Sequence, residues 1–235
     1  ILGYEDHYHA PYDDEPGVCS YLLMELGFCD LNHIMNEIDI EDDETLARTF
    51  FHQIVNGLEY LHSNGFAHLD LKPENLLLGQ DFELKITDFD MSYQTGDICT
   101  VGKGTPYYRA PEVAKRKCKK PKAADIYSIG IILFILKFGQ LPYDEKAPVL
   151  GYDLQQLMFK NPSEFWRAHE KIRGSSFECS EEFKYLFFGL VDEFPENRLT
   201  INEIRRNPWF QGPTYTKQEM SSILGELLKE KICIE

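Results

Sequence analysis

His68-Leu69-Asp70-Leu71-Lys72-Pro73-Glu74-Asn75 is the stretch that most constrains the fold of this chain. Two short apolar runs, 76–78 and 84–86, follow it, and Asp88-Phe89-Asp90 comes one residue after the second run. Short apolar runs bounded by polar and turn-forming residues are typical of strands. Residues 66–90 therefore read as loop, strand, turn, strand and loop, with the polar motifs in the loops.

The residue types in these motifs suit phosphoryl transfer. The transferred phosphoryl group must be held in line between two oxygens while its negative charge is neutralised. Metal ions that do this need hard oxygen ligands, and a nearby cation stabilises the transition state. Asp70, Lys72, Asn75 and Asp88 supply an orienting carboxylate, a cation, an amide oxygen and a metal-binding carboxylate.

Each of these residues alone would usually be a solvated loop residue, so the joint spacing carries the interpretation. Asp70 and Asn75 have Asp-x-x-x-x-Asn spacing, and a strand followed by Asp-Phe comes next. The segment then closes on Gly104-Thr105-Pro106-Tyr107-Tyr108-Arg109-Ala110-Pro111-Glu112. All three motifs in this order match the catalytic segment of protein kinases.

On these motifs the chain resembles the protein kinase superfamily over about residues 1–210. Its overall texture is most similar to the calcium/calmodulin-type serine/threonine branch. The Lys72-Pro73-Glu74 sequence is the serine/threonine form of the catalytic loop. The resemblance implies ATP and Mg²⁺ as cofactors and proteins with serine or threonine hydroxyls as substrates.

The resemblance also implies a role for each matching residue. Asp70 is the catalytic base, Lys72 contacts the γ-phosphate, and Thr105 hydrogen-bonds near both. Asn75 and Asp88 hold Mg²⁺ and so contribute to nucleotide binding.

A second set of positions matches the adenosine side of the nucleotide site. Met24 matches the gatekeeper, and Glu25 and Gly27 match the hinge whose backbone binds adenine. The resemblance implies that Leu77 lies under the adenine ring. Asp30 reaches towards the ribose, although the hinge is one residue short there.

Three further matches are architectural. Glu112 is expected to pair with Arg198. Asp125, in Asp-Ile-Tyr-Ser-Ile-Gly, is expected to brace the backbone around His68, and His68 is expected to stack on Phe89.

The chain departs from the family pattern in several places. The glycine-rich loop, the strand lysine and its helix glutamate are absent and are expected to precede Ile1. Leu69 stands where the family has arginine, so control by a phosphate on Thr95, Thr100 or Thr105 is not expected. Asp90 replaces a glycine, which tolerates unusual backbone angles more readily. Ile135 occupies a position where some basic-directed kinases carry an acid, which argues against a strong basic consensus around Glu74.

The bulk composition excludes several classes of protein. The chain has 235 residues, 43% hydrophobic and 27% charged, so it can bury a core. Its net charge of −15 argues against a nucleic-acid-binding surface. The apolar run 126–138 is too short to span a membrane. The six cysteines are Cys19, Cys29, Cys99, Cys118, Cys179 and Cys233. No two of them have CxxC spacing, which favours a reduced, cytoplasmic setting, with the nucleus as the alternative.

The rest of the chain reads as follows. Residues 1–4 and 19–25 are expected strands separated by an acidic loop, and a short helix is expected near Asp30 and Leu31. A helix is expected behind the acidic run 39–44, ending at Asn64-Gly65, and a buried helix at 124–138. Thr200 with Glu203, and Thr216 with Glu219, have capping-box spacing. The basic run 115–122 is expected to be a solvated loop.

The predicted fold is α+β and kinase-like, with a complete, mostly helical large lobe and part of the small-lobe sheet. Residues 1–26 would be the small-lobe remnant, 27–210 the large lobe, and 211–235 a helical extension. The last helix either packs on its own domain or docks a regulatory partner. The favoured function is a protein serine/threonine kinase. Two alternatives are a catalytically impaired kinase that acts as a binding or scaffold module, and a small-molecule phosphotransferase.

Overall fold

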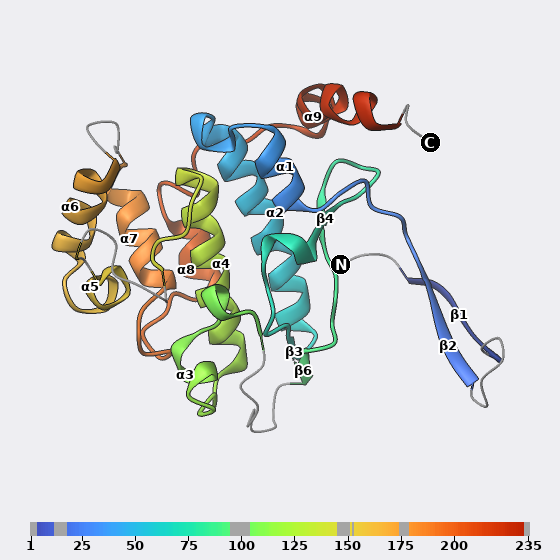
Figure 1. Cartoon of the computed structure of the whole chain (residues 1–235), viewed down its shortest axis with the longest axis horizontal. Helices are drawn as coiled ribbons and strands as arrows, with labels where there is room; N and C mark the ends of the chain where they lie inside the picture. The colour runs from blue at the N-terminus through green and yellow to red at the C-terminus, as the bar shows by residue number, and fades with distance from the viewer. Residues whose placement is uncertain are drawn as a thin grey trace.

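The computed structural model describes residues 4–11, 18–94, 104–144, 151, 153–173 and 179–232. Strands β1 (Tyr4–Pro11) and β2 (Val18–Met24) form an antiparallel hairpin that projects from a helical body (Figure 1). The expected strand at 1–4 is wrong in its extent, because β1 begins at Tyr4 and continues through residues expected to be loop. Pairing with β2 supplies its backbone hydrogen bonds, so a polar sequence can still form a strand. Residues 1–3 lie outside the described residues.

The helical body contains short strands and helices in the order that the sequence indicates. The strands are β3 (Phe66–Ala67), β4 (Leu76–Leu78), β5 (Leu84–Ile86) and β6 (Tyr93–Gln94). The helices are α1 (Leu31–Glu37), α2 (Glu44–Ser63), α3 (Pro111–Ala114), α4 (Pro121–Phe138), α5 (Leu154–Lys160), α6 (Pro162–Arg173), α7 (Glu181–Leu190), α8 (Ile201–Arg206) and α9 (Lys217–Ile232). The predicted mostly helical α+β fold, with only part of the small-lobe sheet, is confirmed.

Helix α4 forms the centre of the core. It is apolar along nearly its whole length, and it packs against α2 on one side and α7 on the other (Figure 1). Phe134 contacts Phe165, Trp166 and Phe187 with ring centroids 5.1–6.1 Å apart, which joins α4 to α6 and α7. A helix that is hydrophobic all round must be buried in this way. The predicted buried helix at 124–138 is confirmed.

Helix α2 begins and ends as local chemistry requires. Asp43 caps it by accepting a hydrogen bond from the Leu46 amide at 3.0 Å. The acidic run before it does not join the helix, because Ile40–Asp42 form a 3₁₀ turn. At the other end Gly65 has φ 84°, which a glycine adopts at little cost.

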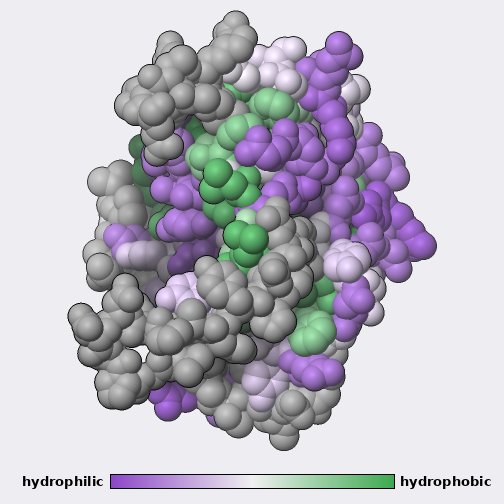
Figure 2. All heavy atoms as spheres, turned by 90° about the vertical axis from the view of Figure 1, so that its right-hand side faces the viewer, coloured by the Kyte–Doolittle hydropathy of each residue, from purple (hydrophilic) through white to green (hydrophobic). Residues whose placement is uncertain are grey.

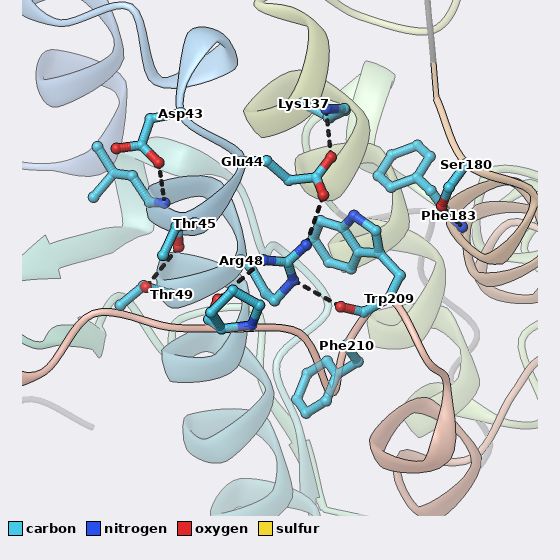
Figure 3. Close-up of polar contacts among 12 residues, drawn as sticks. Asp43, Glu44, Thr45, Arg48, Thr49, Lys137, Ser180, Phe183, Trp209 and Phe210 are labelled. Atoms are coloured by element: carbon cyan, nitrogen blue, oxygen red, sulfur yellow. Dashed lines mark hydrogen bonds and ion pairs between the residues drawn. The ribbon is translucent and has the colours of Figure 1, made fainter.

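A buried arginine ties the segment after α8 to helix α2. The Arg48 guanidinium donates to the carbonyls of Trp209 at 2.7 Å and Pro213 at 2.9 Å (Figure 3). It also donates to Glu44 at 2.6 Å, and Lys137 of α4 donates to the other oxygen of Glu44 at 2.6 Å. One charge network therefore joins α2, α4 and the residues after α8.

Residues 209–215, which we call the C-terminal strap, lie along α2. The ring of His52 stacks on Phe210 at 3.7 Å, and its Nε2 lies 2.6 Å from the Phe210 carbonyl. The Tyr215 amide donates to the Thr49 hydroxyl at 2.8 Å, and its own hydroxyl donates to Asp43 at 2.8 Å. The chain beyond Phe210 thus continues on the same body.

Both predicted capping boxes are present. Thr200 and Glu203 cap α8 reciprocally, and Thr216 and Glu219 cap α9. Met220 and Leu224 of α9 are buried in the core, so the first half of this helix packs on its own domain, which is the first of the two alternatives for it. In the described part of the chain, no helix combines the length and apolar character that a membrane crossing requires.

The hairpin leaves apolar side chains exposed. Leu22 is 59% exposed and Leu26 in the following segment is 79% exposed. Figure 2, which faces this side of the molecule, shows hydrophobic surface in the middle of the view among hydrophilic residues.

Candidate active site

Asp125, a fully buried residue of α4, fixes the backbone of the loop before β4. Its carboxylate accepts hydrogen bonds from the backbone amides of His68 and Leu69, both at 2.8 Å. The predicted brace around His68 is confirmed. His62, at the end of α2, adds a contact of 2.8 Å between its Nε2 and the same carboxylate. This arrangement compensates the burial of a charge, which would be costly without partners.

His68 links this loop to the segment after β5. Its Nε2 lies 2.8 Å from the Thr87 carbonyl, and its ring centroid is 5.1 Å from that of Phe89. His68 and Phe89 are in contact as predicted, but their rings are tilted by 57° and are not stacked. The two polar motifs are therefore fixed relative to each other.

The candidate catalytic residues converge on the carboxylate of Asp70. Its Oδ1 accepts hydrogen bonds from the Thr105 amide at 2.7 Å and the Thr105 hydroxyl at 2.8 Å. Lys72 Nζ lies 3.3 Å from Oδ2 and donates to the Thr105 hydroxyl at 3.1 Å. The Asn75 side-chain amide donates to the Asp70 carbonyl at 2.9 Å. Asp70 is 8% exposed, so these contacts orient a carboxylate that still reaches solvent.

A close backbone approach also holds the segment around Thr105 against Asp70. Gly104 has φ 95°, and a Cβ built on it would lie 2.6 Å from the Leu69 carbonyl oxygen. Only glycine fits both the angle and the space. The sequence therefore needs glycine directly before Thr105.

Asp88 follows β5 with an exposed side chain and φ 61°. The Thr87 amide donates to the Asn75 carbonyl at 3.1 Å, which sets the start of the Asp88 segment beside Asn75. The Asn75 amide nitrogen is bonded to Asp70, so the amide oxygen is the atom left for a ligand. An amide oxygen and a carboxylate are hard donors that suit Mg²⁺.

The described residues contain no cluster of three or more histidine, cysteine, aspartate or glutamate side chains that could hold a metal. A magnesium ion at Asn75 and Asp88 would therefore need further oxygen ligands from water and phosphate. This is the usual coordination of Mg²⁺ at nucleotide sites. The residues present thus fit a nucleotide-bound ion.

The residues predicted to bind the adenosine part lie at the junction between the hairpin and β4. Phe28 donates from its amide to the Leu78 carbonyl at 2.8 Å, and Asp30 and Leu77 form an isolated antiparallel bridge. A Cβ built on Gly27 would lie 3.1 Å from Leu77 Cβ, so these two residues adjoin. Glu25, which directly follows β2, is half-buried.

Asp30 has a second structural use. Its Oδ1 accepts a hydrogen bond from the His33 amide at 2.7 Å and so caps α1. The predicted helix start at Asp30 and Leu31 is confirmed. A ribose contact would have to use the other oxygen of this carboxylate.

The two substituted positions have different surroundings. Leu69 is 5% exposed and has φ 64°, so its side chain belongs to the core. Asp90 is exposed, and its φ is not positive. The conformation described here therefore does not require glycine at position 90. Thr95 and Thr100 lie outside the described residues.

The third motif is anchored by a buried ion pair. Arg198 donates to both carboxylate oxygens of Glu112, each at 2.7 Å, and to the Ala123 carbonyl at 2.8 Å. Such bidentate pairing fixes both position and orientation. The predicted pairing of Glu112 with Arg198 is confirmed. Nearby, burial raises the pKa of Tyr108, and the charge of Glu74 raises it further.

Sequence reasoning missed His62 as a partner of Asp125. The only local signal was a histidine in the last turn of a helix, where a favourable contact with the helix end explains it equally well. The two residues are 63 positions apart, so a single sequence does not pair them.

Comparison with known proteins agrees with this geometry. A protein kinase domain family model matches residues 12–210. CBL-interacting serine/threonine-protein kinase 8 of Arabidopsis thaliana is 41% identical over 174 residues, which cover 71% of this chain and 35% of that protein. CBL-interacting protein kinase 30 of Oryza sativa subsp. japonica is 37% identical over 189 residues, which cover 77% of this chain and 36% of that protein. The chain thus spans about a third of the length of these curated relatives.

Proposed function

Because this chain belongs to the protein kinase family, we propose that the protein containing it transfers the γ-phosphoryl group of ATP to serine and threonine hydroxyls of proteins. The single observation that carries this proposal is the arrangement around Asp70. A carboxylate, a cation and a hydroxyl meet within hydrogen-bond distance at the surface of a braced loop.

Asp70 is proposed to orient the acceptor hydroxyl and take its proton. Thr105 occupies Oδ1 through two hydrogen bonds, so the carboxylate cannot rotate freely. Oδ2 then faces the acceptor and is the atom that would hold the proton. General bases work best when they are fixed in this way before the substrate arrives.

Lys72 is proposed to stabilise the negative charge of the transferred phosphoryl group. Its side chain is 21% exposed and its ammonium group lies between Asp70 and Thr105. A cation at this place faces the same space as Oδ2. Pre-organised charges of this kind are among the largest contributions to catalysis.

Asn75 and Asp88 are the residues proposed to hold Mg²⁺ together with the nucleotide phosphates. When bound, the ion neutralises charge on the phosphate oxygens. Glu25, Gly27, Asp30 and Leu77 are proposed to bind the adenosine part, with the backbone of the hinge contacting adenine.

The substrate would need little basic character near the acceptor. Glu74 is exposed beside the catalytic loop, but Ile135 is buried where a second acid would strengthen a basic preference. The buried Leu69 also offers no cation for a regulatory phosphate. Activity without phosphorylation of the loop is therefore expected.

Regulation by a partner is also a proposal. The relatives are named as CBL-interacting kinases. Because Met220 and Leu224 of α9 are buried on this domain, a partner that docks on α9 would have to use its other faces.

We also propose a reducing, cytoplasmic setting. Cys179 forms no disulfide with another described residue, and burial raises the pKa of its thiol to about 11.

The substitution Asp70→Asn in the full-length protein tests the proposal. It keeps the shape of the side chain but removes the base, so phosphate transfer to a protein substrate should fall by about 10²–10⁴-fold. ATP binding, measured by displacement of a fluorescent nucleotide, should be retained. Asp153→Asn is the matched control, since Asp153 caps α5 and asparagine caps as well. Unchanged transfer by Asp70→Asn would refute the assignment of the base.

A further inference from the structure

The basic segment, residues 115–122, stands out against an acidic chain. It contains six of the 24 lysines and arginines in a protein of net charge −15. They are Lys115, Arg116, Lys117, Lys119, Lys120 and Lys122. The predicted loop between two helices is confirmed for residues 115–120, which join α3 to α4, whereas Pro121 and Lys122 are the first residues of α4.

The cations of this segment are available to a ligand. The side chains at 115–117, 119 and 120 are exposed. None of these five forms an ion pair with another described residue, whereas Lys72, Lys85 and Lys137 elsewhere do. Lys122 is the exception, since it donates to the His62 carbonyl and is partly buried. A free cation retains its full attraction for an external anion.

A pocket of about 910 Å³ opens beside the basic segment. Lys119, Lys120 and Lys122 line it. Pro195, Leu199 and Ile201, from the loop before α8 and its first turn, also line it and are partly buried. The pocket therefore combines a cationic rim with an apolar wall. Its volume is far larger than a single inorganic ion requires and suits side chains of a peptide or a medium-sized ligand.

Two of the residues that line the pocket are held in place by the rest of the fold. Ile126 is buried in it, and Arg198 is fixed by its ion pair with Glu112. Of the two carboxylates that border it, Glu59 is neutralised by Arg205 at 2.6 Å, while Glu196 is exposed. The local charge is therefore positive, although the whole chain is acidic.

We infer that the basic segment and this pocket bind an acidic peptide segment of another protein that also carries an apolar side chain. The exposed cations extend along the chain beyond the pocket, which matches several carboxylates in an extended peptide better than one compact ligand. The apolar wall gives a neighbouring side chain a place to be buried. Nucleic acid fits less well, because its continuous phosphate charge would extend beyond this segment along a chain of net charge −15.

This inference does not rest on the proposed kinase activity. None of the residues proposed to bind nucleotide or transfer phosphate borders the pocket. Binding can therefore be measured with no phosphate donor present, and its failure would leave the proposed function untouched.

The test is a fluorescence-anisotropy titration of the full-length protein with a short labelled peptide in which glutamates surround two leucines. The combined substitution Lys119→Glu and Lys120→Glu should weaken binding by about tenfold or more, because attraction becomes repulsion. Raising the salt concentration should weaken binding of the parent protein. Ala123→Met, which narrows the pocket without changing charge, should weaken the leucine peptide but not a version with serines in place of leucines.

Matched controls decide the outcome. Lys160→Glu with Lys217→Glu makes the same charge change at two exposed lysines that do not border the pocket, and it should leave binding within about twofold, because solvent and salt weaken charges that do not contact the peptide. Equal weakening by both pairs, or equal binding of a peptide with glutamines in place of glutamates, would overturn the inference. So would tighter binding of phosphatidylserine vesicles or single-stranded DNA through the same two lysines.

Discussion

Leu69 shows how one residue can be held in an unfavourable conformation by its neighbours. Its φ of 64° lies in the left-handed region, which side chains with a Cβ rarely adopt. The Asp125 carboxylate accepts hydrogen bonds from the backbone amides of His68 and Leu69, and the Leu69 side chain is buried. Asp125 is 56 positions from Leu69 in sequence, so the position of the neighbouring Asp70 depends on a distant residue.

The substitution Asp125→Asn tests this dependence. Asparagine offers one acceptor oxygen, so a backbone amide or His62 would lose its partner in a fully buried place. We expect the free energy of unfolding to fall by about 2–3 kcal/mol, the cost of leaving a buried donor unsatisfied. Urea unfolding followed by circular dichroism measures it. The exposed cap variant Asp153→Asn should change stability little, and an equal loss in both variants would contradict the role given to Asp125.

At the scale of elements, the sequence predicted helices better than strands, because helix signals are local. The capping boxes at Thr200 and Thr216 and the periodic face of α2 depend on residues three or four apart. Strand β1 has no comparable local signal. Its polar residues become a strand only through pairing with β2, for example His7 with Leu22.

The C-terminal strap was also invisible to sequence reasoning. Arg48 reads as a helix surface residue, yet it is 5% exposed and contacts residues more than 160 positions later. A long, partly apolar side chain can be buried in this way when its charge is fully bonded. Nothing in a single sequence identifies the carbonyls of Trp209 and Pro213 as its partners.

The substitution Arg48→Met tests the contribution of the strap. It removes both contacts to the strap carbonyls and one partner of Glu44, so we expect a loss of about 3 kcal/mol in the free energy of unfolding. Limited proteolysis should cut residues 209–215 faster than in the parent protein. Arg167→Met is the matched control, because Arg167 is exposed and its pair with Glu164 is worth little. If Arg48→Met were as stable as this control, the strap contacts would contribute no net stability.

Across the whole molecule, the candidate site could be predicted from the family resemblance but not from spacing alone. Asp70, Lys72 and Asn75 are neighbours in sequence, so their proximity was expected. Thr105 lies 35 positions from Asp70, and only the resemblance placed it there before the structure did. Physical reasoning on one sequence identifies the chemistry of such groups, whereas the fold determines which of them meet.

The response of the whole molecule to acid follows from several shifted groups. Burial lowers the pKa of His52, which opposes the gain of a proton in the folded state. Burial raises the pKa of Glu44, but the hydrogen bond and charge of Lys137, together with the charge of Arg48, outweigh this effect, so the pKa is lowered. For both groups the unfolded chain binds more protons than the folded chain as the pH decreases. The free energy of unfolding therefore decreases on acidification.

The two groups act in different pH windows. His52 begins to destabilise the fold below its unfolded pKa of about 6.5, and Glu44 does so below its unfolded pKa of about 4.3.

His52→Gln should therefore flatten the fall in the free energy of unfolding between about pH 7 and pH 5 while leaving the steeper loss in stronger acid. Glutamine can still donate to the Phe210 carbonyl but loses the stacked ring, so the variant should start from a lower stability at neutral pH. Urea unfolding across this range measures both effects. The parent protein, measured in parallel, supplies the reference slope. If His52→Gln kept that slope, proton uptake by His52 would not account for the loss of stability above pH 5.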